Sequence, residues 1–161
     1  MQKITPFLWF NNDAEEAANF YVSIFPNSKI RTVSRYEEAG AAVSGRAAGS
    51  VQVVSFEING QRFDALNGGP MFSFTPAISF LVECDTQEEI DHYWEKLTEG
   101  GSVQQCGWLS DKYGVTWQIA PRILDELVSG PDAARNTRVM KAMLGMVKLD
   151  IAALEKAAAG E

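Results

Sequence analysis

An internal repeat constrains the fold of this chain more than any other feature. Residues 12–21 (NDAEEAANFY) match residues 85–94 (DTQEEIDHYW), with acidic residues at corresponding positions near the start of each. Apolar side chains then follow at i, i+3, i+4 and i+7, the spacing of an amphipathic helix: Ala17, Phe20, Tyr21 and Ile24, and Ile90, Tyr93, Trp94 and Leu97. Asp13 and Thr86 are the predicted N-caps. Such a repeat indicates two copies of one structural unit.

Segments rich in β-forming residues flank each predicted helix. We expect strands at residues 5–10, 29–36, 50–58 and 62–66 in the first half, and at 76–82, 103–106, 108–110 and 115–120 in the second. Each half therefore follows the order β-α-β-β-β, and a helix on one sheet face leaves the other face uncovered. The predicted fold class is α+β: two βαβββ modules (residues 1–70 and 71–121) forming curled mixed sheets around a cleft, plus a C-terminal helical extension (residues 122–161).

The C-terminal extension carries three apolar stripes at helical spacing. They are Ile123, Leu124, Leu127 and Val128; Met140, Met143, Leu144 and Val147; and Ile151 and Leu154, the last following Asp150 as a cap. The helices of the two modules already use their apolar stripes on the sheets. We therefore predict a homodimer in which the extension packs across the subunit boundary, and the alternative is an extension folded back on its own module.

Composition excludes several classes of function. A net charge of −7 argues against nucleic-acid binding, which calls for a basic surface. No apolar run reaches the ~20 residues that span a bilayer, so we expect no membrane partner. The two cysteines, Cys84 and Cys106, fit a reducing cytoplasm better than a disulfide framework.

Residues 37–50 are expected to form a mobile loop. They contain GAAVSGRA at residues 40–47, a segment that lacks the lysine, the hydroxyl and the following helix of a phosphate-binding loop.

Four segments carry a resemblance to a known family: ITPFLWF (residues 4–10), ALNGGP (65–70), AISF (77–80) and CGWLSDKYGVTWQI (106–119). With the paired βαβββ modules, they make the chain similar to the vicinal oxygen chelate superfamily of glyoxalases, dioxygenases and bleomycin-resistance proteins. Within it, the chain resembles the PhnB-like, or 3-demethylubiquinone-9 3-methyltransferase-like, subfamily. None of these residues supports methyl transfer.

The resemblance also implies where metal ligands would lie. In the metal-dependent relatives they come from the first and last strands of each module, which places them near Pro6, Asp64, Ser79 and Gln118. Proline has no donor atom, and serine and glutamine are weak ligands, whereas a catalytic metal generally takes three good protein ligands. The single histidine, His92, falls on the polar face of the second repeated helix. We therefore predict no metal and no other cofactor.

Three polar residues are candidates for ligand binding because strand alternation separates them from the helix-packing side chains. Ser79, Thr116 and Gln118 alternate with Ile78, Phe80, Val115, Trp117 and Ile119. Trp108 is the candidate pocket wall, and Cys106 has the same parity. The alternative is that these polar residues hydrogen-bond one another beneath a closed cleft. Asp111 and Lys112, at a hairpin tip, are expected to be solvated.

Three functions follow from these patterns. The first is a protein that binds a small apolar or aromatic molecule without a metal, in a cleft that includes Ser79, Trp108, Thr116 and Gln118. The second is an enzyme of proton transfer or isomerisation, with Asp64 or Cys106 as the weak catalytic candidates. Cys106 would need a base or cation to favour its thiolate. The third is a structural or regulatory dimer whose cleft is merely filled.

Overall fold

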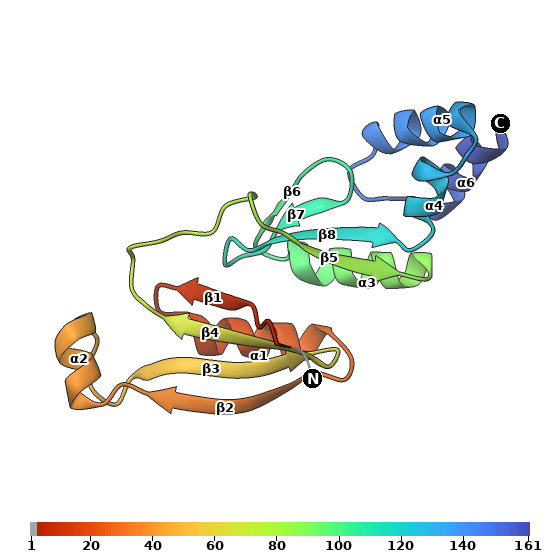
Figure 1. The fold of residues 1–161 in the computed structure, drawn as a ribbon. Coiled ribbons are helices and arrows are strands. Elements are labelled where there is room, and N and C mark those ends of the chain that lie inside the picture. Colours follow the sequence, from red (N-terminus) through yellow and green to blue (C-terminus); the bar gives the residue numbers. More distant parts are fainter. Residues whose placement is uncertain (1–2) are drawn as a thin grey trace. The chain divides into compact units, whose positions relative to one another are not determined.

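The computed structural model describes residues 3–161, and the contacts within it divide the chain at Phe74 and Thr75 into two compact units. Each unit contains one four-stranded mixed sheet with a helix along it (Figure 1). In both sheets the first strand pairs in parallel with the last, and the two remaining pairs are antiparallel. The repeat found in the sequence is thus a repeat of the βαβββ fold.

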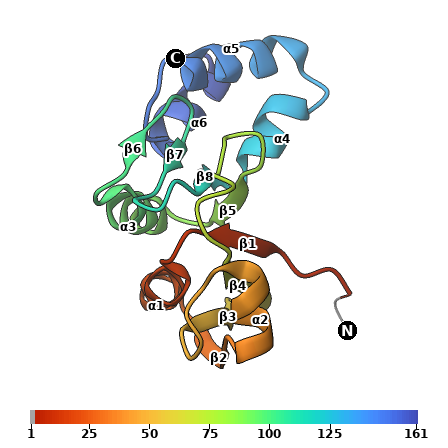
Figure 2. The same cartoon turned by 90° about the vertical axis from the view of Figure 1, so that its left-hand side faces the viewer.

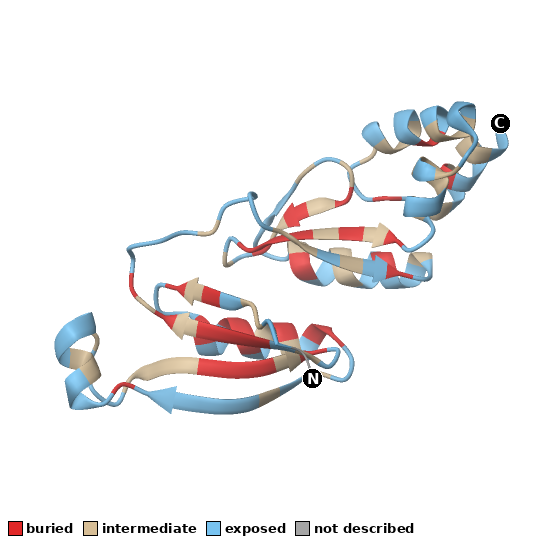
Figure 3. Ribbon diagram, viewed as in Figure 1, coloured by how far each residue is buried: buried red, intermediate tan, exposed pale blue. Residues whose placement is uncertain are grey.

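The first unit is built from β1 (Phe7–Phe10), α1 (Ala14–Ile24), β2 (Lys29–Arg35), β3 (Val51–Ile58) and β4 (Gln61–Asn67), with strand order β1-β4-β3-β2. Helix α1 packs on β2, β3 and β4, along one side of the sheet (Figure 2). The Phe56 ring stacks with Tyr21 of the helix and with Phe63 of the next strand. The core of this unit therefore lies between α1 and the central strands, where Figure 3 shows the middle of β3 and of β4 buried.

The second unit repeats this arrangement with β5 (Phe80–Cys84), α3 (Gln87–Thr98), β6 (Ser102–Val103), β7 (Trp108–Ser110) and β8 (Thr116–Pro121), in the order β5-β8-β7-β6. Helix α3 packs on β5, β7 and β8. Its stripe residues Ile90 and Leu97 are fully buried, as are Leu109 and Ile119 on the facing strands. Burying one such side chain stabilises the fold by about 1.5–3 kcal/mol.

Three local predictions were wrong, each for a physical reason. Strand β5 begins at Phe80, so Ile78 lies before it, 74% exposed, and does not pack under a helix. The predicted mobile loop contains helix α2 (Glu38–Ser44), which ends at Gly45 in the left-handed conformation. Its run of alanines has high helix propensity. Asp13 makes no side-chain cap bond.

The N-terminus of α1 is instead capped from another element of its unit. The Asn67 side-chain Oδ1 accepts a 2.9 Å hydrogen bond from the Ala14 N–H, and its Nδ2 donates to the Val51 carbonyl. By contrast, Thr86 caps α3 as predicted, accepting from the Glu89 N–H. A tertiary contact can satisfy the free N–H groups of a helix start as well as a neighbouring residue can.

The C-terminal extension forms α4 (Leu124–Ser129), α5 (Ala133–Leu144) and α6 (Ile151–Ala159). Its connecting segment docks on the second unit: the N–H groups of Cys106 and Gly107 donate to the carbonyls of Met146 and Val147 at 2.9 and 2.7 Å. The Gln87 side chain donates to the Leu149 carbonyl and accepts from the Ile151 N–H. These contacts are those of an extension folded back on its own module.

Several apolar side chains of the extension nevertheless stay exposed, including Met140, Leu144 and Val147. Met140 and Leu144 border a groove of about 410 Å³ between α4 and α5. None of the helices in the described residues is long and apolar enough to cross a bilayer.

Candidate ligand-binding face

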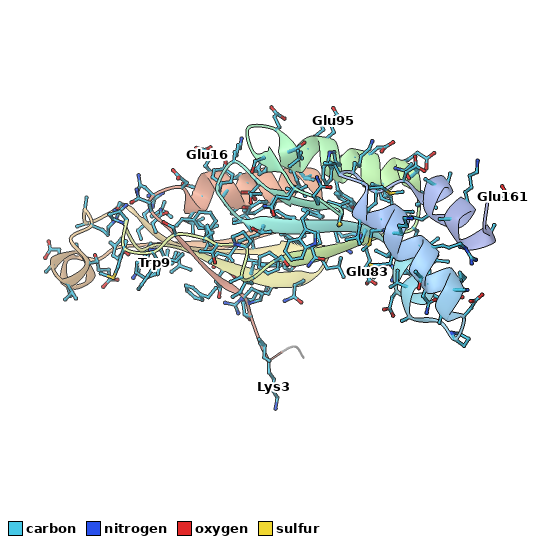
Figure 4. All side chains as sticks on the ribbon, turned by 90° about the horizontal axis from the view of Figure 1, so that it is seen from above. Lys3, Trp9, Glu16, Glu83, Glu95 and Glu161 are labelled. Atoms are coloured by element: carbon cyan, nitrogen blue, oxygen red, sulfur yellow. The ribbon has the colours of Figure 1, made fainter. Side chains whose placement is uncertain are left out.

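The strand register sorts the second sheet into a helix-covered face and an open face. Across β7, β8 and β5, Trp108 lies opposite Gln118, which lies opposite Leu81, and Ser110 lies opposite Thr116. The next set along the same strands, Leu109, Trp117 and Phe80, points toward α3. In Figure 4, Glu95 projects from the outer side of α3, while Glu83 of β5 lies on the opposite side of the sheet. We call the open side, with Ser79, Leu81, Trp108, Ser110, Thr116 and Gln118, the second-sheet face.

Hydrogen bonds between side chains organise this face. Gln118 Nε2 donates to Ser79 Oγ at 2.8 Å, which joins the last strand to the segment just before β5. Gln104 Nε2 donates to Ser110 Oγ at 3.2 Å, and the Ser110 and Thr116 hydroxyls lie 3.5 Å apart. Pairs of this kind restrict the rotamers of the side chains that they join.

The four residues singled out from the sequence thus come to one sheet face, but not to equal depth. Ser79, Trp108 and Gln118 are half-buried, so part of each side chain remains open to solvent. Thr116 is only 1% exposed, and its hydroxyl is within reach of Ser110 rather than of solvent. Thr116 therefore supports Ser110 from beneath instead of offering a surface of its own.

Sequence reasoning missed three members of this neighbourhood: Leu81, Gln104 and Ser110. Strand alternation could have found Ser110, which is two residues after Trp108 on the same strand. It could also have found Leu81, which shares the parity of Ser79. Gln104 lies before β7, outside any regular strand, and no pattern in the sequence places its side chain against Ser110.

Cys106 does not line this face. Residues 104–107 form a turn, with Cys106 at a φ of +60°, so the parity that linked Cys106 to Trp108 does not apply. The Cys106 thiol donates to the Met143 carbonyl at 3.6 Å, toward the C-terminal extension. No base or cation contacts the thiol among the described residues, and its contacts give it a structural role.

Asp64 lies on the open face of the first sheet, opposite Phe7 and Ser55 on the neighbouring strands. The Arg62 guanidinium binds both carboxylate oxygens, at 3.0 Å for Oδ2 and 3.2 Å for Oδ1. The Asp64 side chain is 9% exposed and that of Arg62 is 54% exposed. The carboxylate is therefore covered by its own ion pair, which leaves little of it to act as a base.

The prediction that Asp111 is solvated was wrong. Asp111 is 3% exposed and is the centre of the β7–β8 turn. Its Oδ1 accepts from the N–H groups of Tyr113 and Val115, and its Oδ2 accepts from Trp117 Nε1 at 2.9 Å. A buried carboxylate with three donors is well satisfied. Lys112 is exposed, with its ammonium group over the Tyr113 ring.

The positions that the resemblance assigns to metal ligands do not supply a donor set. Pro6 has no donor atom, Asp64 is bound to Arg62, and the Gln118 amide donates to the Ser79 hydroxyl. Among residues 3–161 no three His, Cys, Asp or Glu side chains lie close enough together to hold a metal ion. His92 is exposed on α3. These residues do not fit the metal centre of the metal-dependent relatives.

The remaining cysteine is a core residue. Cys84, at the end of β5, is 1% exposed. Burial, together with the nearby carboxylates of Glu89 and Asp85, raises the pKa of the Cys84 thiol to about 12. The thiolate is the reactive form of cysteine, so Cys84 is inert at neutral pH.

Comparison with known proteins adds a family match. The family model described as 3-demethylubiquinone-9 3-methyltransferase matches residues 2–120. A PhnB protein from Bacillus cereus, described as a 3-demethylubiquinone-9 3-methyltransferase, is 42% identical, with 74% of this chain and 99% of that chain covered and a TM-score of 0.67. A comparison with curated proteins gave no match.

Two more distant structures share the fold. Protein PA1353 from Pseudomonas aeruginosa is 18% identical, with a TM-score of 0.60 over 75% of this chain and 98% of that chain. The fosfomycin resistance protein FosX from Listeria monocytogenes is 16% identical, with a TM-score of 0.53 over 78% of this chain and 97% of that chain. The comparisons cover the two βαβββ units better than the C-terminal extension, since the family model ends at residue 120.

Proposed function

Because the chain belongs to the 3-demethylubiquinone-9 3-methyltransferase family, in the vicinal oxygen chelate superfamily, we propose that it binds a small apolar or aromatic molecule without a metal. The second-sheet face is the proposed binding surface, with Ser79, Trp108 and Gln118 in contact with the ligand and Thr116 beneath them. We do not transfer the methyltransferase activity, since no residue of this face supports methyl transfer.

One observation carries this proposal: preorganised polar pairs stand beside an indole ring on a sheet face that α3 does not cover. The Gln118–Ser79 bond and the Gln104–Ser110 bond fix the polar groups. Trp108 lies directly across from Gln118 on the neighbouring strand and is half-buried. Binding sites for small molecules typically combine apolar and aromatic surface with a few fixed polar groups.

Catalysis by proton transfer has less support. Both oxygens of Asp64 accept hydrogen bonds from Arg62, and the Cys106 thiol faces a main-chain carbonyl of the extension. A general base must lie within reach of the proton that it removes. The Asp64 side chain is 9% exposed beside Arg62 and the Cys106 thiol is directed at the extension, so little of either group is accessible to a substrate.

Binding of indole, a neutral aromatic probe, tests the proposal by nuclear magnetic resonance. We expect millimolar indole to shift the Gln118 side-chain amide signals and the main-chain signals of β7 and β8. Gln118→Leu should weaken the binding, whereas Gln105→Leu, the same change in the exposed turn before β7, should not. Shifts that map elsewhere, or none on the second-sheet face, would overturn the proposal.

We also propose that the protein is a homodimer. The exposed Met140 and Leu144, which line one groove, and the exposed Val147 support this proposal, since exposed large apolar side chains favour association. Light scattering should give the mass of two chains for the natural protein. Leu144→Glu should lower that mass, while Val43→Glu, at a 90% exposed site in the first unit, should not. A single-chain mass at 100 µM natural protein would contradict the proposal.

The cytoplasm is the proposed location. Cys84 and Cys106 are both free thiols, one of them buried, and a reducing compartment keeps such thiols intact. Fractionation of source cells, with the protein detected by antibody, should find it with cytoplasmic markers. Recovery in a membrane or exported fraction would refute this location.

A further inference from the structure

The central part of the second-sheet face carries no charge. Its side chains are neutral: Ser79, Leu81, Gln104, Trp108, Ser110 and Gln118. The next residue of this face along β5 is Glu83. The Arg122 guanidinium lies 3.7 Å from the Glu83 carboxylate, and the Nε of Arg122 lies 2.8 Å from the Asp85 carboxylate. Arg122 thus offsets one of the two carboxylates, and the net negative charge that remains lies at the end of the strand rather than at the centre of the face.

The hydrogen-bond inventory of the face shows what its neutral groups still offer. Gln118 uses one amide N–H on Ser79, and its Oε1 accepts no hydrogen bond from the described residues. Ser79 accepts that bond and keeps its own hydroxyl proton. If the amide is turned the other way, the pair still presents uncharged donors and acceptors. Gln104 likewise donates to Ser110, whose hydroxyl also lies 3.5 Å from that of Thr116.

A charged ligand group would lose much of its hydration here without meeting an opposite charge. Burying an unpaired ion costs far more than burying a hydroxyl or carbonyl that finds a partner. The face therefore discriminates by charge. It favours molecules that present a flat apolar body to Trp108 and neutral polar groups to the amide–hydroxyl pairs.

We propose that the ligand class of this face is an uncharged aromatic compound bearing a hydroxyl or carbonyl group, recognised by Gln118 and Ser79 beside Trp108. This inference rests on the proposed function and narrows it. Gln118 is then a specificity-determining residue. Its neutral amide sets the preference for an uncharged polar substituent, and Gln104 and Ser110 provide a second pair for a substituent across the ring.

Three probes of one size separate the effect of charge from that of ring binding: 2-naphthol, 2-naphthoate and 2-naphthylmethylammonium, each titrated at pH 7 by nuclear magnetic resonance. We expect 2-naphthol to bind at least about tenfold more tightly than either ion, the factor that corresponds to about 1.4 kcal/mol. Gln118→Glu should reverse the order, with 2-naphthylmethylammonium becoming the tightest of the three. Gln105→Glu adds the same charge in the exposed turn and should leave the order unchanged.

The outcomes distinguish the two proposals. If 2-naphthoate or 2-naphthylmethylammonium binds the second-sheet face of the natural protein as tightly as 2-naphthol, the inference is overturned and the proposed function stands. If no probe perturbs this face, the proposed function fails. If Gln118→Glu does not fold, Ser79→Ala replaces it: it should weaken 2-naphthol at least about threefold and leave both ions unaffected. Equal weakening of all three probes would overturn the inference.

Discussion

Replacing Gly107 by alanine tests how the C-terminal extension is attached to the second unit. Gly107 has a φ of +80°, and a Cβ built there would lie 2.6 Å from the Ile119 carbonyl oxygen and 3.1 Å from Leu149 Cγ. The main chain at Gly107 also makes two hydrogen bonds: its N–H donates to the Val147 carbonyl and its carbonyl accepts from the Ile119 N–H. One methyl group therefore disturbs β8 and the extension together.

The magnitude follows from these contacts. The left-handed conformation costs a residue with a Cβ about 1–2 kcal/mol. Moving the main chain away from the Ile119 oxygen weakens two hydrogen bonds, each contributing about 0.5–1.5 kcal/mol. It also loosens Leu149, which is fully buried. We expect Gly107→Ala to lower the free energy of unfolding by about 3 kcal/mol or more.

Urea unfolding followed by circular dichroism measures this loss, with Gly60→Ala as the control. Gly60 has a φ of +81°, but a Cβ at Gly60 would meet no atom within 4 Å. The control thus contains the conformational cost without the close contact, and we expect about 1–2 kcal/mol for it. If the losses of stability of the two variants agree to within about 0.5 kcal/mol, then Gly107 does not approach Ile119 and Leu149 closely in solution and the reasoning is refuted.

Three further predictions concern the capping, the buried thiol and the docking contact. Asn67→Ala should destabilise the first unit by about 1–3 kcal/mol in urea unfolding, because it orphans the Ala14 N–H; Asn67→Asp, which keeps the acceptor, should lose less, and an equal loss would contradict the cap. Stability should fall from about pH 8.5 upward by as much as about 1.4 kcal/mol per pH unit, because the folded pKa of Cys84, about 12, exceeds its unfolded value; Cys84→Ala should flatten this part of the profile, and an unchanged slope would refute the assignment. The Lys148 hydrogen bond lowers the pKa of Asp91, so Lys148→Met should raise that pKa in a carbon-13 titration, and no change would show that the contact is absent in solution.

The sequence predicts a residue of the site only where strand alternation determines the position of that residue. Ser79, Trp108 and Gln118 share a sheet face because side chains on paired strands alternate with a period of two, a property that depends only on local backbone geometry. Gln104 could not be placed, since it joins Ser110 from an irregular turn. Cys106 was misplaced for the same reason: a left-handed residue breaks the alternation on which the parity argument relied.

The sequence by itself determined the two βαβββ units and the helices of the extension, because these depend on periodicity and propensity. Only the tertiary structure decided how polar groups are satisfied. Asp111 became a buried acceptor for Trp117 rather than a solvated charge, and Asn67 rather than Asp13 capped α1. The docking of the extension on Gln87 and Gly107 likewise depends on groups far apart in the chain. A buried donor or acceptor must find a partner wherever the fold brings one near, and no local pattern encodes that choice.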